Sequence, residues 1–154
     1  MLKDAKHPCH EIVCNATALK KASRRLTQLY DTALEHCGLR STQLAILVEL
    51  NSRAEQPPSL AELAEALVIE RSALGHTLRP LEREGWVSLQ PGQDRRQRQV
   101  VITSKGKAKA KEGLRLWTVA QDRFEDVYGR SEAAGLRRTL LGIAYQERLT
   151  KLKD

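Results

Sequence analysis

The sequence predicts a mainly α-helical protein with one small β-hairpin. Apolar residues recur at steps of three and four along most of the chain, which is the period of amphipathic helices. In the middle of the chain the pattern becomes β-prone over residues 86–89 and 99–102, and a Pro-Gly turn lies between these two runs. The 154 residues fit one compact domain with helical extensions.

A long amphipathic helix is predicted over residues 11–37, after a polar arm at 1–10. The segment contains neither Pro nor Gly, and Gly38 follows it as a C-terminal stop. Its stripe of apolar or small residues alternates between steps of four and three: Ile12, Ala16, Leu19, Ser23, Leu26, Tyr30, Ala33 and Cys37. Ser41 or Thr42 then caps a second helix, which ends before the Pro-containing loop at 53–58.

Two short helices and the hairpin form the pattern of a winged helix-turn-helix. Ser59 caps the first of these helices, and Glu62 three residues later completes a capping box. A tight link at 68–69 leads to a helix over 70–84, which Gly85 ends. The predicted inner faces of the two helices consist of Leu60, Leu63, Ala64 and Leu67, and of Leu74, Leu78 and Leu81.

The C-terminal part is predicted to contain two long helices separated by Gly129. Thr103 or Ser104 caps the first, whose stripe is Leu114, Trp117, Gln121, Phe124 and Tyr128. The second spans 131–152, with Leu136, Leu140, Ile143 and Leu149 facing inward. These stripes and that of helix 11–37 are too long for the middle of the chain to cover. They favour a homodimer over an intramolecular bundle. We therefore expect an N-terminal arm and dimerisation helix at 1–38, a DNA-binding domain at 39–103 and dimerisation helices at 104–154.

The helix at 70–84 carries the candidate DNA contacts. The second helix of such a motif lies in the major groove, where Arg pairs with guanine and hydroxyl or imidazole groups reach base edges or phosphates. Ala73 and Gly75 are small and let the backbone approach the groove. The candidate residues are Arg71, Ser72, Ala73, Gly75, His76, Thr77, Arg79 and Arg83. Four of them, Ser72, His76, Arg79 and Arg83, lie opposite the core stripe. The alternative interpretation is an ordinary solvated helix face.

The tip of the hairpin favours the DNA interpretation. It carries Arg95, Arg96 and Arg98, with Asp94 as the single opposing charge. Arginines on a projecting loop suit the narrow, electronegative minor groove. We expect Asp94 to orient a neighbouring arginine rather than to contact DNA.

These segments resemble the multiple-antibiotic-resistance regulator (MarR) family. The resemblance rests on SLAELAEAL at 59–67, ERSALGHTLRPLEREGWV at 70–87 and DRRQRQVVITSKG at 94–106, which includes the Asp-Arg-Arg wing and the Thr-x-x-Gly that follows it. It implies an intertwined dimer that binds a pseudo-palindromic double-stranded DNA operator, usually as a repressor. In this family an anionic aromatic ligand or oxidation of a thiol commonly releases the DNA.

Three cysteines are too few, and odd in number, for a disulfide framework. Cys14 lies at the start of the first helix, where the thiol pKa is lowered, and is a candidate redox residue with Cys9 as its partner. A semi-buried packing role for Cys14 is the alternative. The resemblance adds weight to oxidation, although residues 41–58 lack the tyrosines that position the thiol in peroxide-sensing relatives.

A cleft for a small anionic aromatic effector is expected between the first two helices and the DNA-binding part. Polar residues interrupt apolar surface there at Ser23, Arg24, His36 and Gln43, although solvation of a helix surface explains them equally well. His7, Cys9, His10 and Cys14 match no standard zinc spacing, so we expect neither a metal nor another cofactor.

Composition narrows the class of function. A net charge of +7 favours a polyanionic partner, and only 4% aromatic residues disfavour base-stacking RNA modules. The sequence has no signal peptide and no membrane span, so we expect a cytoplasmic protein. It has no phosphate loop or nucleophile elbow and is not predicted to be an enzyme. The alternative to a sequence-specific regulator is a non-specific architectural, nucleoid-type DNA-binding protein.

Overall fold

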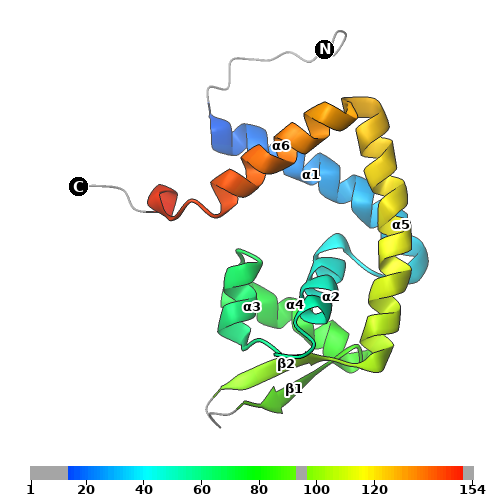
Figure 1. Cartoon of the computed structure of the whole chain (residues 1–154), viewed down its shortest axis with the longest axis vertical. Helices are drawn as coiled ribbons and strands as arrows, with labels where there is room; N and C mark the ends of the chain where they lie inside the picture. The colour runs from blue at the N-terminus through cyan, green and yellow to red at the C-terminus, as the bar shows by residue number, and fades with distance from the viewer. Residues whose placement is uncertain (1–13, 93–96, 151–154) are drawn as a thin grey trace.

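A computed structural model describes residues 14–92 and 97–150. Figure 1 shows α5 as a long helix that joins α1 and α6 to a lobe made of α2, α3, α4 and the hairpin. The elements are α1 Asn15–Leu34, a 3-10 helix Glu35–Cys37, α2 Ser41–Ser52, α3 Leu60–Ala66, α4 Arg71–Arg83, β1 Val87–Pro91, β2 Arg98–Ile102, α5 Ser104–Tyr128, α6 Arg130–Ala144 and a 3-10 helix Glu147–Thr150. The predicted fold, mainly helical with one small hairpin, is confirmed.

The apolar core lies between α2, α3, α4 and the hairpin. The predicted inner residues of α4 are all buried, and Leu63 and Val100 bring α3 and β2 into the same cluster. This cluster extends through Leu34 into the end of α1 and through Ala110 into α5. The lobe is therefore packed directly against the helices that flank it in the sequence.

The hairpin forms a two-stranded antiparallel sheet. Val87 pairs with Ile102 and Pro91 with Arg98, so each strand reaches one or two residues beyond the run predicted from sequence. The segment before α3 pairs with β2 through one isolated bridge: the Val100 N–H donates to the Pro58 carbonyl at 2.9 Å, and Ser59 pairs with Gln99. The base of the wing is thereby attached to the start of α3.

The helix caps agree with the sequence in α3 and differ in α2. In α3 the Glu62 N–H donates to Ser59 Oγ at 3.3 Å, and the Ser59 N–H donates to Glu62 Oε2 at 2.7 Å, as the capping box predicts. In α2, Ser41 is the first helical residue rather than the cap. The Ser41 N–H has no partner within the helix and donates to Asp31 Oδ1 at 2.7 Å, so a carboxylate of α1 takes the place of the predicted hydroxyl cap.

The α5 residues that are buried within one chain are small, and the predicted stripe of large residues is covered only in part. Within the chain, α5 buries its small residues Gly106, Ala110, Gly113 and Ala120. A Cβ on Gly113 would come within 2.7 Å of Leu44 Cδ1, so α5 approaches α2 closely at this point. The predicted stripe faces outward in part, with Leu114 42% and Trp117 37% exposed. Small residues allow this close approach, which a pattern of large apolar residues does not reveal.

The last helix is shorter than predicted. α6 ends at Ala144, and a 3-10 turn at Glu147–Thr150 follows it instead of a helix to residue 152. Tyr145 ends the helix, and its hydroxyl donates to the Ala66 carbonyl at 3.0 Å, which ties this end to α3. Leu136 and Leu140 are partly buried, whereas Ile143 and Leu149 are exposed and do not face inward within one chain. No helix within the described residues is long and apolar enough to cross a membrane.

Candidate nucleic-acid interface

Helix α4 presents a polar face to solvent. Ser72, His76, Arg79 and Arg83 are exposed, while Leu74 and Leu81 on the other side are fully buried. The helix is continuous through Pro80. The burial of the leucines fixes which face points outward, so four hydrogen-bonding side chains are held on one side of a rigid helix.

The remaining candidates of α4 lie at the start and middle of the helix. Arg71 is its first residue and is exposed, as is Ala73. The Thr77 hydroxyl donates to the Ala73 carbonyl at 3.0 Å, so in this structure it is engaged within the helix. A Cβ on Gly75 would meet no atom within 4 Å. Packing within the chain therefore does not require glycine at this position.

The link between α3 and α4 contains a strained residue. Val68 has a φ of +52°, in the left-handed region that β-branched side chains rarely adopt, and it is 53% exposed. Two hydrogen bonds close the turn, from Val68 N–H to the Glu65 carbonyl and from Ile69 N–H to the Ala64 carbonyl, both at 3.0 Å. No residue of the link indicates this conformation in advance, because Gly or Asn is the usual signal for it.

The described residues include the base of the predicted wing and one of its arginines. Arg98 is the first residue of β2 and is exposed. Asp94, Arg95 and Arg96 lie outside the described residues. The Gly92 N–H donates to the Gln97 carbonyl at 2.8 Å, which closes the base of the tip. This end of the hairpin lies away from α5, as Figure 1 shows.

Two side chains attach the end of α4 to the start of α5, a role that was not predicted from the sequence for either residue. Lys105 Nζ donates to the Glu84 carbonyl at 2.8 Å, and Thr103 Oγ1 donates to the Gly85 carbonyl at 2.7 Å. Lys109 lies one turn further along α5, 5.2 Å from the centre of the Trp86 ring, and donates to the Cys37 carbonyl at 3.1 Å. The run of lysines after Thr103 was the available signal.

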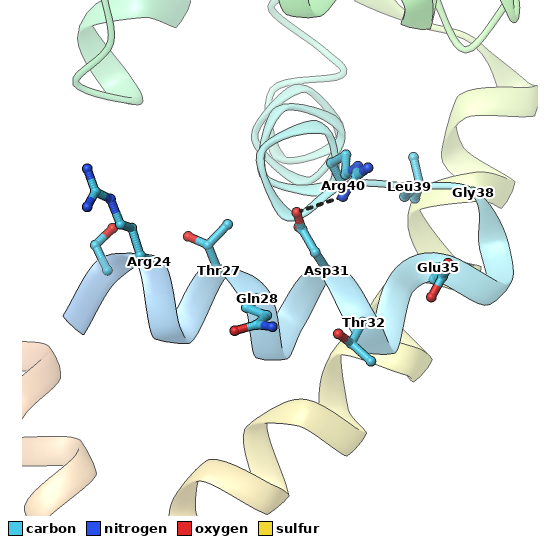
Figure 2. Close-up of a pocket in the computed structure, with 10 residues that line it drawn as sticks. Arg24, Thr27, Gln28, Asp31, Thr32, Glu35, Gly38, Leu39 and Arg40 are labelled. Atoms are coloured by element: carbon cyan, nitrogen blue, oxygen red, sulfur yellow. Dashed lines mark hydrogen bonds and ion pairs between the residues drawn. The ribbon is translucent and has the colours of Figure 1, made fainter. Parts of the chain in front are cut away.

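An open cavity of about 630 Å³ lies between α1 and the turn that leads into α2, and Figure 2 shows the side chains that line it. It contains two of the four predicted effector residues, Ser23 and Arg24. Gln43 lines a different cavity, beside the end of α4, and its Oε1 accepts from the Arg40 N–H at 2.9 Å. His36 is an exposed residue of the 3-10 turn. Of the four predicted effector residues, the structure therefore brings together only Ser23 and Arg24.

Charges of both signs line this cavity. Asp31 accepts from the Ser41 N–H, and its carboxylate lies 3.4 Å from Arg40 NH1, the contact drawn in Figure 2. Partial burial acts to raise the pKa of Asp31, but hydrogen bonds from Ser41 and Arg40 outweigh it and hold the pKa below its usual value. Arg24, unlike Arg40, has no hydrogen-bond or ion-pair partner within the described residues.

Cys14 is an exposed free thiol at the N-cap of α1, as predicted for a candidate redox residue. Hydrogen bonds from the side chain and backbone of Thr17 lower its pKa. Cys37 is buried and donates to the Leu34 carbonyl, which fits a packing role. Cys9 lies outside the described residues. Residues 14–92 and 97–150 contain no group of three or more His, Cys, Asp or Glu that could hold a metal ion.

An apolar groove separates α1 from α6. It has a volume of about 900 Å³ and is lined mainly by alanine, leucine and isoleucine, including Leu19, Leu26, Leu136 and Leu140. Leu19 is 42% exposed although it belongs to the predicted apolar stripe of the first helix. The stripes of α1 and α6 therefore line the same groove and leave it open.

Comparison with known proteins finds transcriptional regulators. A model of the MarR family matches residues 39–97. The HTH-type transcriptional regulator YwoH of Bacillus subtilis is 30% identical over 94 residues, 61% of this chain and 67% of that protein. The structure of the M. tuberculosis regulator MosR in complex with DNA has a TM-score of 0.79 at 27% identity and covers 90% of this chain and 99% of its own. CouR from Rhodococcus jostii, bound to a 23-mer DNA duplex, has a TM-score of 0.77 at 25% identity over 86% and 93% of the two chains.

The winged lobe and the exposed polar face of α4 define a helix-turn-helix transcriptional regulator, not an enzyme. The chain belongs to the MarR family.

Proposed function

We propose that this protein is a cytoplasmic, homodimeric repressor that inserts α4 into the major groove of a pseudo-palindromic double-stranded DNA operator. The observation that carries the proposal is the row of exposed side chains Ser72, His76, Arg79 and Arg83, held in place by buried leucines on the opposite face. Its arginine, imidazole and hydroxyl donors suit base edges and phosphates. The relatives MosR and CouR have been solved with DNA, which supports the same ligand here.

A dimer follows from the apolar surface that one chain leaves open. Leu114 and Val127 of α5 are 42% and 64% exposed, and Leu141 of α6 is 51% exposed. The apolar groove between α1 and α6 adds further uncovered surface. Exposed apolar surface of this extent is unusual for a monomer. A twofold axis would place the two α4 helices in successive major grooves, about 10 base pairs apart. Sedimentation at micromolar concentration showing only the 17.3 kDa species would contradict this part of the proposal.

The DNA proposal is tested by selection and competition. Wild-type protein is used to enrich binding sequences from a random duplex library, and the product is competed against a scrambled duplex. We expect the selected duplex to bind at least about 1,000-fold more tightly, the lower limit for specific binding. Equal affinity for both would indicate an architectural protein instead. Arg79→Ala should weaken binding chiefly at one operator position, by about 1–3 kcal/mol, whereas Arg138→Ala, an exposed arginine of α6, should bind like wild type.

The predicted wing contacts need a separate variant. Arg96→Ala should weaken binding to all sequences by a similar factor and reduce the slope of affinity against salt by about one. A loss confined to one base pair would instead assign Arg96 to base recognition. Wild-type affinity in both Arg96→Ala and Arg79→Ala would refute the docking of α4 and the wing.

Release of the DNA is proposed to occur through a small aromatic acid or through oxidation of Cys14. Arg24 lines the cavity beside α1 and has no ion-pair partner in the described part of the chain, so its guanidinium suits a carboxylate. CouR has been solved with p-coumaroyl-CoA, an aromatic ligand. Salicylate should release operator DNA from the wild type at lower concentrations than from Arg24→Ala. Hydrogen peroxide should release it from the wild type but not from Cys14→Ser. Release that is unaffected by either substitution would exclude both sites.

A further inference from the structure

The end of the recognition helix α4 is attached to α5 through three successive carbonyl groups. Lys105 Nζ donates to the Glu84 carbonyl at 2.8 Å, and Thr103 Oγ1 donates to the Gly85 carbonyl at 2.7 Å. The Thr103 backbone N–H donates to the Trp86 carbonyl at 3.1 Å. All three bonds come from the N-cap and first turn of α5. The junction is therefore held by a local network and not by one contact.

The chemistry of this junction favours a rigid connection between α4 and α5. The last carbonyls of a helix have no partner within it and carry partial negative charge, which an ammonium group stabilises. A Cβ on Gly106 would overlap the Trp86 carbonyl oxygen, so the backbone of α5 lies directly against that of the segment after α4. This contact leaves no space for the two helices to shift toward each other.

The far part of α5 is fixed to α1. Tyr30 donates its hydroxyl to Gln121 Oε1, and its ring stacks on Trp117 at 5.9 Å between centres. Lys109 adds a bond from α5 to the Cys37 carbonyl after α1. Because α5 is one continuous helix of 25 residues, it connects the proposed dimer helices to the recognition helix without a break.

We propose that Lys105, together with Thr103, is a positioning residue for DNA recognition that fixes the direction of α4 relative to α5 and so sets the spacing between the two α4 helices of the dimer. This inference rests on the proposed function. The 13 residues of α4 span about 20 Å. A tilt of about 10° at the junction then moves the far end of α4 by about 3.5 Å, close to the 3.4 Å step between base pairs. A loosened joint should therefore tolerate operators whose half-sites are displaced by one base pair.

The test uses the duplex selected by the wild type, with one base pair inserted or removed at its centre. We expect each change to weaken wild-type binding by about tenfold or more, because half-site spacing is set by the dimer. Lys105→Met keeps the aliphatic chain but loses the donor. It should bind the original duplex less tightly and lose only about two- to threefold on changing the spacing. Lys107→Met is the matched control, because Lys107 is an exposed lysine of the same helix with no side-chain partner among the described residues.

Each outcome decides between interpretations. Wild-type spacing preference in Lys105→Met would overturn the inference, as would an equal loss of affinity at every spacing, which would make Lys105 a phosphate contact. Lys105→Arg should restore the preference, because its guanidinium can still donate to Glu84. If Lys105→Met unfolds, Lys105→Ala, which also loses the donor, provides a second variant and should show the same weakened spacing preference, whereas Thr103→Ser keeps its hydroxyl and should behave like wild type. If the wild type enriches no sequence, the proposed function itself fails, a result distinct from unchanged spacing preference.

Discussion

Replacing Gly75 with alanine separates the stability of α4 from its fit to DNA. Gly75 lies in the middle of α4, and a Cβ there meets no atom within 4 Å. Glycine is less favourable than alanine in a helix interior by about 0.8–1 kcal/mol. Gly75→Ala should therefore raise the free energy of unfolding by about that amount. For a chain of this size, the corresponding rise in Tm is about 2–4 °C.

The same methyl group should weaken DNA binding. If the backbone of α4 approaches the groove at Gly75, the added carbon must displace the helix, and we expect about tenfold lower affinity for the selected duplex, or about 1.4 kcal/mol. Gly142→Ala is the matched control, because Gly142 also lies in a helix and its Cβ also meets no atom within 4 Å. It should raise Tm without changing DNA affinity.

Two assays decide the outcome. Thermal unfolding followed by circular dichroism at one fixed protein concentration gives Tm, since the stability of a dimer depends on concentration. Fluorescence anisotropy with labelled duplex gives the affinity. A lower Tm in Gly75→Ala would refute the packing argument. A raised Tm with wild-type affinity would show that the backbone at Gly75 does not approach DNA.

Three further predictions concern single residues. Val68→Asn should raise the free energy of unfolding in urea by about 1 kcal/mol, because Asn tolerates a positive φ and little burial is lost; a decrease would mean that the turn causes no strain. Gly106→Ala should lower it by about 1–3 kcal/mol, because the new methyl overlaps a backbone oxygen; an unchanged value would show that α5 can move away. In a Cys9→Ser background, Cys14 should react with iodoacetamide at a lower pH than an ordinary thiol. Thr17→Val should move its reaction midpoint to higher pH, because the side-chain hydrogen bond that favours the thiolate is lost; an unchanged midpoint would exclude the Thr17 hydroxyl as a cause.

The elements of the lobe could be predicted because their signals are local. The capping box of Ser59 and Glu62 and the glycine at 85 mark the ends of helices by the chemistry of a few neighbouring residues. The spacing of leucines in α4 was enough to predict its buried face, and the opposite face could then be predicted to be exposed. The candidate contacts on α4 followed from that geometry, although their role in binding DNA remains a prediction.

The parts that were missed depend on contacts between distant residues. Asp31 caps α2 from another helix, and Tyr145 binds the Ala66 carbonyl 79 residues away, so neither shows in a local pattern. Lys105 looked like one of several surface lysines until the structure placed it on the end of α4. Four polar residues were expected to share a cleft, but only Ser23 and Arg24 do, because His36 is exposed on the 3-10 turn and Gln43 lines the cavity beside the end of α4.

The two halves of α5 make pairing and docking separately adjustable. In the first half, Gly106, Ala110 and Gly113 are buried and hold the helix against the lobe by backbone proximity; in the second half, Val119 and Val127 are 63% and 64% exposed and remain available to a second chain of the proposed dimer. Changes at these exposed positions can alter which copies pair, and so exclude mixed dimers with a similar regulator in the same cell, without moving α4. Partner choice and operator choice can thus diverge independently along a single helix.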